Sequence, residues 1–143
     1  MKKILFLFLS IYSVSALANP LSNDIEIIGF TNQQHPFSKS QYLDKTYYLD
    51  KADKLLAQMS KGLPADPQQA EKIMRQRMSS PEWSQFIAKQ KEASEEMLKG
   101  WEMGIKKVPA IVFVNKTQQN SVIYGVTNVA KAIQIYKTKT KQY

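Results

Sequence analysis

Residues 106–114 read KKVPAIVFV, and this stretch decides the fold. Proline has no N–H to donate to a sheet ladder, so Pro109 marks the point where a strand opens. The short, β-branched and apolar run at residues 110–114 predicts that strand.

The residues after this strand predict a hairpin and a final helix. A polar turn region at 115–120 precedes a second short run at 121–124, which we expect to pair with the first. Thr127 or Asn128 can then cap the last helix. Its expected buried face consists of Val129, Ala130, Ile133 and Tyr136.

Two further strands are expected in the first part of the chain. Residues 24–31, DIEIIGFT, form a β-branched run bounded by polar clusters, a pattern typical of a strand. A polar loop follows at 32–38, and residues 46–49 predict the second strand.

Two helices follow the second strand. Asp50 is placed to cap the first, and Gly62 to end it in the left-handed conformation. Asp66 and Pro67 form the start signal of the second helix. The apolar positions expected to face inward are Ala52, Leu55, Leu56, Met59, Ile73, Met74 and Met78.

The longest helix is expected to begin at Ser80-Pro81-Glu82 and to end near Gly104. Its apolar residues recur at helical spacing along one stripe. We interpret this stripe as core packing rather than as a ligand site. It consists of Trp83, Phe86, Ile87, Met97, Leu98 and Trp101.

The predicted element order is β–β–α–α–α–β–β–α. The simplest arrangement is an α/β fold with a four-stranded mixed sheet and helices packed on it. We expect the first and third strands to pair in parallel at its centre.

The N-terminal residues predict export. Lys2-Lys3 is a basic start, residues 4–14 are mainly apolar, and Ala16-Leu17-Ala18 matches a signal-peptide cleavage site. The apolar run is shorter than the roughly 20 residues of a spanning helix, although a retained anchor is the alternative. We therefore expect a signal peptide at 1–18 and one soluble periplasmic domain at 19–143.

The chain is basic, with 20 Lys and Arg residues against 12 Asp and Glu. No acidic residue follows Glu102, whereas seven lysines do. One interpretation is a solvated face with a basic tail. The other is attraction to an anionic envelope surface, an acidic partner or DNA. The sequence lacks the pattern of arginines interspersed with aromatic residues that is typical of a nucleic-acid binder.

The loop Thr31–Pro36 contains the only histidine, His35. A histidine can act as a general acid or base near neutral pH, but the sequence reveals no partner for it. With one histidine and no cysteine, we expect no metal site and no cofactor. The absence of cysteine also excludes dithiol–disulfide exchange, because the attacking group is a thiolate.

Pro109 has two interpretations. It can simply open a strand, or a cis Val108–Pro109 bond can expose neighbouring backbone groups that pair with an extended peptide. The two are compatible.

Several motifs occur in an order that resembles a known family. They are Phe30-Thr31, His35-Pro36, Tyr48-Leu49-Asp50, Gly62-Leu63-Pro64-Ala65-Asp66-Pro67, Ser80-Pro81-Glu82-Trp83, Val108-Pro109-Ala110-Ile111-Val112-Phe113 and Tyr124-Gly125-Val126-Thr127. Together they resemble small exported proteins encoded in bacterial integrating conjugative elements, which are distantly similar to F-type conjugative pilin-assembly proteins.

The resemblance implies a thioredoxin-like fold with an enlarged helical insertion and a cis proline at Pro109. It also implies a periplasmic component of the type IV secretion or mating-pair apparatus. In a thioredoxin, the loop that corresponds to Thr31–Pro36 holds the two redox cysteines, and this sequence has no cysteine there. The resemblance supplies no catalytic residues, and the implied partner-binding groove is formed by Thr31, His35, Pro36, Val108 and Pro109.

Three functions are left open by the sequence. The preferred one is a non-catalytic interaction protein that holds other envelope proteins of the transfer apparatus. The second is a thiol-independent folding catalyst or isomerase, which would depend on His35. The third and weakest is a DNA-contacting protein, whose binding would depend steeply on salt.

Overall fold

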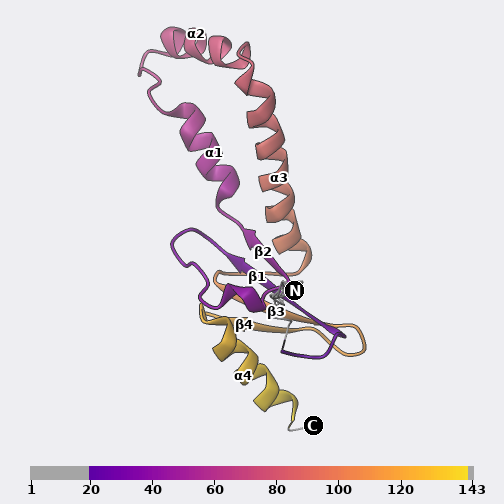
Figure 1. Ribbon diagram of the computed structural model, residues 1–143. Helices are drawn as coiled ribbons and strands as arrows, with labels where there is room; N and C mark the ends of the chain where they lie inside the picture. Colours follow the sequence, from indigo (N-terminus) through magenta and orange to yellow (C-terminus); the bar gives the residue numbers. More distant parts are fainter. Residues whose placement is uncertain (1–19, 142–143) are drawn as a thin grey trace, which may run out of the picture.

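The computed structural model describes residues 20–141, so the predicted signal peptide lies outside the described residues. Four strands, four α-helices and a short 3-10 helix follow one another along this part of the chain (Figure 1). In order they are β1 (Ile25–Thr31), η1 (Ser40–Tyr42), β2 (Lys45–Tyr48), α1 (Lys51–Ser60), α2 (Pro67–Met78), α3 (Glu82–Glu102), β3 (Ala110–Asn115), β4 (Ser121–Tyr124) and α4 (Val129–Thr140). Within residues 20–141, none of the helices combines the length and the apolar character needed to cross a membrane.

The sheet confirms the predicted four-stranded mixed arrangement, with strand order β2-β1-β3-β4. β1 pairs in parallel with β2, and β3 is antiparallel to both β1 and β4. The predicted parallel pairing of the first and third strands is therefore wrong. The reason is the path of the chain between β2 and β3. The chain leaves the sheet at the end of β2, and α3 brings it back to that same end, where Gly100 lies against Leu49 and Phe30. β3 consequently starts where β1 finishes.

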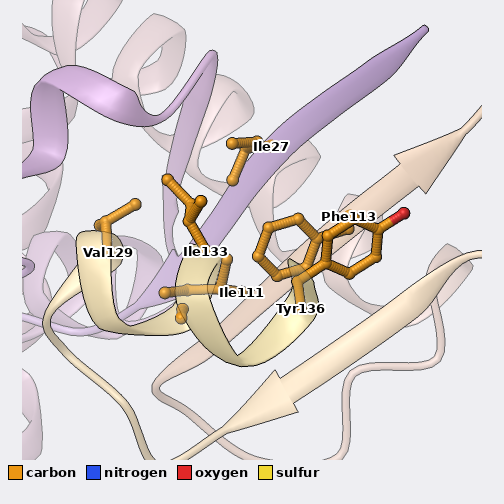
Figure 2. Packing of buried hydrophobic residues seen from close by; sticks show 7 residues of the cluster. Ile27, Ile111, Phe113, Val129, Ile133 and Tyr136 are labelled. Carbon is orange, nitrogen blue, oxygen red and sulfur yellow. The ribbon is translucent and has the colours of Figure 1, made fainter. Parts of the chain in front are cut away.

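One face of the sheet packs against α4. Ile27, Ile111 and Phe113 of the strands contact Val129, Ile133 and Tyr136 of the helix (Figure 2). The rings of Phe113 and Tyr136 stack with centroids 4.3 Å apart. The alternating strand positions Ile28, Phe30, Ala110 and Val112 form a second cluster with residues of β2, β4 and the connection after α3. Because successive side chains of a strand point to opposite faces of the sheet, the buried residues form one cluster on each face.

The helices α1, α2 and α3 form a helical arm that projects from the sheet (Figure 1). Few of its side chains are buried. Trp83 and Phe86 stack with ring centroids 5.1 Å apart, but Trp101 is 69% exposed. The other large apolar residues of the arm that are exposed are Leu56, Met78, Ile87 and Leu98.

The prediction that the apolar stripe of the longest helix is core packing is therefore wrong for Ile87, Leu98 and Trp101. The inward placement predicted for Leu56 and Met78 is wrong as well. Leu56, Met78 and Ile87 lie on faces of the arm that no other described element covers. For Leu98 and Trp101 the physical reason is length, because α1 has 10 residues and α3 has 21. At a rise of about 1.5 Å per residue, α1 covers only half of its neighbour.

Most of the predicted helix boundaries are confirmed by their caps. The side chains of Asp66 and Asn128 accept hydrogen bonds from the N–H groups of the third helical residues, so Asn128 rather than Thr127 caps α4. Gly62 and Gly104 have φ values of 77° and 68° just beyond α1 and α3, a conformation that favours glycine. Asp50 precedes α1 as predicted, but its side chain does not cap the helix.

Candidate functional site

The predicted site residues lie around one end of the sheet. Phe30 pairs with Ala110, and Ala110 pairs with Tyr124. The end of β1, the start of β3 and the end of β4 therefore meet at this end of the sheet, with Thr31 and Pro109 each one residue beyond these pairs. The Val108–Pro109 peptide bond is cis. The carbonyl of Pro109 accepts a hydrogen bond from the N–H of Gly125 at 2.9 Å, which joins β3 to the end of β4.

The loop after β1 is closed by its own hydrogen bonds. The side-chain oxygen of Asn32 accepts from the N–H groups of Gln34 and His35 at 3.1 and 3.0 Å, and it lies 2.8 Å from Nδ1 of His35. The buried Thr31 hydroxyl donates to the carbonyl of His35. These bonds fix the loop so that His35 and Pro36 are both exposed to solvent.

A polar contact between Asp50 and the loop secures it from the arm side. The Asp50 carboxylate accepts from the Gln33 N–H at 3.2 Å and from Lys54 Nζ at 2.8 Å. Lys54 also donates to the Gln33 side chain. Burial raises the pKa of Asp50, but these hydrogen bonds and the charge of Lys54 outweigh it and hold the pKa below its ordinary value of 3.8. Asp50 is therefore a charged anchor for the loop.

Glu96 is a buried carboxylate that links the arm to the sheet. It accepts from the Tyr48 N–H at 2.8 Å and from Lys51 Nζ at 2.5 Å. A buried charge is tolerated when it is paired and hydrogen-bonded in this way. Glu96 thus connects α3 to the end of β2 and the start of α1.

The backbone of Val108 is free for an additional contact. Within residues 20–141, neither its N–H nor its C=O has a hydrogen-bond partner. Its half-buried side chain packs against the cluster that contains Phe30 and Val112, which holds the residue in place. This end of the sheet therefore presents one backbone donor and one backbone acceptor beside Pro109.

The structure places Thr31, His35 and Pro36 in one hydrogen-bonded loop, and Val108 and Pro109 on the connection that enters β3. No hydrogen bond in the described part of the chain joins His35 to Val108 or Pro109. A search of the same residues for three or more His, Cys, Asp or Glu side chains that could hold a metal ion found none.

The sequence analysis missed Asn32 and the contact among Gln33, Asp50 and Lys54. An asparagine three residues before His35 is a signal for such a turn, because its side chain readily bonds to following N–H groups. The Gln33–Asp50 contact spans 17 residues and left no local pattern to detect.

Two clefts open along the arm, and the first of them borders the loop at Gln33. One, of about 200 Å³, has Gln33, Lys54 and Lys89 among its lining residues. The other, of about 290 Å³, is more apolar and includes Leu55, Trp83 and Phe86. The first cleft therefore continues the loop surface onto the arm.

Comparison with known proteins gave one family. Residues 23–142 match the profile of the family described as protein of unknown function (DUF1525). Neither the search of curated proteins nor the search of solved structures found a match.

Proposed function

The chain belongs to the DUF1525 family, and from this premise we propose that it is a non-catalytic docking protein with a thioredoxin-like fold. In this proposal it is a periplasmic component of the transfer apparatus of a conjugative element, the type IV secretion or mating-pair machinery. It holds another envelope protein by contacts at the end of the sheet formed by Thr31–Pro36 and Val108–Pro109.

The topology supports the thioredoxin-like part of the proposal. A parallel β1–β2 pair is extended by the antiparallel strands β3 and β4, and the final helix covers one face. The helical arm occupies the position of an enlarged insertion between β2 and β3. The motifs that resemble proteins of integrating conjugative elements support the cellular role.

The observation that carries the docking role is the free backbone of Val108 beside the exposed loop. An extended peptide can pair with an unpaired backbone N–H and C=O, and Val108 offers both at the end of the sheet where β3 starts. Asn32 and Asp50 fix the neighbouring loop, so little ordering is required when the partner binds.

Photo-crosslinking in a conjugating donor tests this role. A benzoylphenylalanine in place of Gln34, in the loop, is expected to crosslink to another envelope protein. The matched control replaces Gln118, an exposed glutamine in the hairpin turn between β3 and β4, and is expected to give no such product. Deletion of the gene should abolish transfer, and the intact gene should restore it. Equal crosslinking from both positions, or transfer that is unchanged by the deletion, would contradict the proposal.

One observation favours a second candidate, a thiol-independent folding catalyst or isomerase. Asn32 lies 2.8 Å from Nδ1 of His35 and orients the ring, as a general base requires. In this alternative, His35→Ala abolishes function in the transfer assay. The docking proposal instead expects His35→Ala to have only a mild effect in the same assay.

A further inference from the structure

Lys106 and Lys107 lie immediately before Val108 and are exposed. Neither forms an ion pair with any of the described residues. The ammonium of Lys107 lies over the ring of Tyr124, 5.6 Å from its centroid, which places one of these charges beside the end of β4. The free backbone of Val108 is therefore preceded by two uncompensated positive charges.

The lysines at β2 and the start of α1, by contrast, form ion pairs. Lys45 pairs with Glu26 at 2.8 Å, and Lys51 pairs with Glu96 at 2.5 Å. Lys54 pairs with Asp50 at 2.8 Å. No acidic residue follows Glu102 in the sequence, so the β3–β4 side has no carboxylate of its own to balance its lysines. Two of these lysines, Lys106 and Lys107, directly precede the free backbone of Val108.

We propose that the partner docks through an extended acidic segment. Its backbone pairs with the N–H and C=O of Val108, and its carboxylates contact Lys106 and Lys107. Complementary charge of this kind guides encounter and selects between partners. This inference rests on the proposed docking role and specifies the chemistry of the partner.

A peptide fits this end of the sheet better than a nucleic acid does. An extended peptide offers both a donor and an acceptor to Val108, whereas a phosphodiester backbone offers only acceptors. Single-strand binders also stack bases on free aromatic faces, and here Lys107 lies over the Tyr124 ring.

The experiment uses two labelled synthetic peptides and fluorescence anisotropy. One alternates glutamate with valine, and the other alternates glutamine with valine. The acidic peptide is expected to bind the mature protein about tenfold more tightly than the neutral one, and more weakly as salt is added. The double variant Lys106→Glu, Lys107→Glu should reduce its affinity to that of the neutral peptide.

The matched control is Lys139→Glu, Lys141→Glu, which changes the net charge equally at the far end of α4 and should bind as the parent does. Circular dichroism verifies that both variants are folded. Equal affinity for the two peptides, no binding of either, or equal weakening in both variants would overturn the proposal. Tighter binding of a single-stranded oligonucleotide, lost in the Lys106→Glu, Lys107→Glu variant, would also overturn it and assign the site to nucleic acid.

The Gln34 crosslink separates this inference from the docking role. If that crosslink persists in the Lys106→Glu, Lys107→Glu variant, the docking site is retained and the acidic partner is excluded. If the parent protein crosslinks to another envelope protein from position 118 and not from position 34, the docking role itself fails.

Discussion

The sheet with α4 and the helical arm both contain apolar side chains but differ in what those side chains contact. The sheet and α4 contain nearly all of the buried hydrophobic residues, whereas Ala52 and Ala93 are those of the arm. Trp101 and Leu98 of the arm are at least half exposed. We infer that stability is concentrated in the sheet and α4, and that the arm depends on a few contacts at its base.

The largest expected effect compares two aromatic residues, one in each region. Phe113 is fully buried and stacks on Tyr136, so Phe113→Ala should cost about 3–5 kcal/mol in the free energy of unfolding. Trp101→Ala, its matched control in the arm, should change stability by no more than about 0.5 kcal/mol. Chemical denaturation of both variants provides the measurement. Similar losses would mean that the arm is as tightly packed as the sheet.

A smaller loss is expected from adding one methyl group inside the sheet. A Cβ at Gly29 would lie 2.6 Å from the Phe37 ring and 2.8 Å from Leu43. Gly29→Ala should therefore cost roughly 1–3 kcal/mol through overpacking. At Gly100 the new Cβ would lie 3.1 Å from the end of the Leu49 side chain, which can move.

Gly100→Ala serves as the comparison in the arm. Alanine is favoured over glycine inside a helix by about 1 kcal/mol, which offsets the contact with Leu49. We expect its midpoint in a thermal melt to stay close to that of the parent. A Gly29→Ala protein as stable as Gly100→Ala would indicate that Phe37 and Leu43 readily repack.

The junction between the two regions is tested at Glu96. Glu96→Gln removes the charge that pairs with Lys51 and weakens the bond from the Tyr48 N–H. The free energy of unfolding should fall by about 1–2 kcal/mol, because a hydrogen bond to a charged group stabilises a protein more than a neutral one by roughly that amount. Hydrogen exchange should also become faster in α1 and α3 while β3 stays protected.

The exposed neighbour Glu95 is the matched control on the same helix. Glu95→Gln should leave both stability and exchange close to those of the parent. Faster exchange in β3 after Glu96→Gln would mean that the arm and the sheet unfold as one unit.

The same contrast explains what could be predicted from the sequence. The strands and most helix ends were correctly predicted, because β-branched runs and caps such as Asp66 are local signals. The direction of β3 was not, since it depends on where α3 returns the chain to the sheet. Periodicity showed that α3 has an apolar face, but it could not show that α1 is too short to cover Leu98 and Trp101.

The candidate site likewise has features that could be predicted from the sequence and features that could not. Its location at the end of β1 and the start of β3 could be predicted from the Val108–Pro109 step and the loop that follows Thr31. The contacts that hold the loop could not, because Asp50 and Gln33 are joined only by the fold. The sequence indicated Asp50 as a helix cap, and the structure instead directs its carboxylate to the loop.

The smallest expected effect concerns this Asp50 contact. Because its pKa is lower in the folded protein than its ordinary value of 3.8, the stability it contributes is fully present above that value. The contribution is lost as the pH falls from 3.8 through the folded pKa, where the carboxylate is protonated. For a partly exposed ion pair we expect a contribution of about 0.5–1 kcal/mol to the free energy of unfolding.

The Asp50→Asn variant should therefore be less stable than the parent at neutral pH, and the difference in stability should narrow in acid. The exposed Asp53→Asn is the control in the same helix, and thermal unfolding across this pH range provides the comparison. A difference that stays constant with pH would assign the role of Asp50 to packing rather than to its charge.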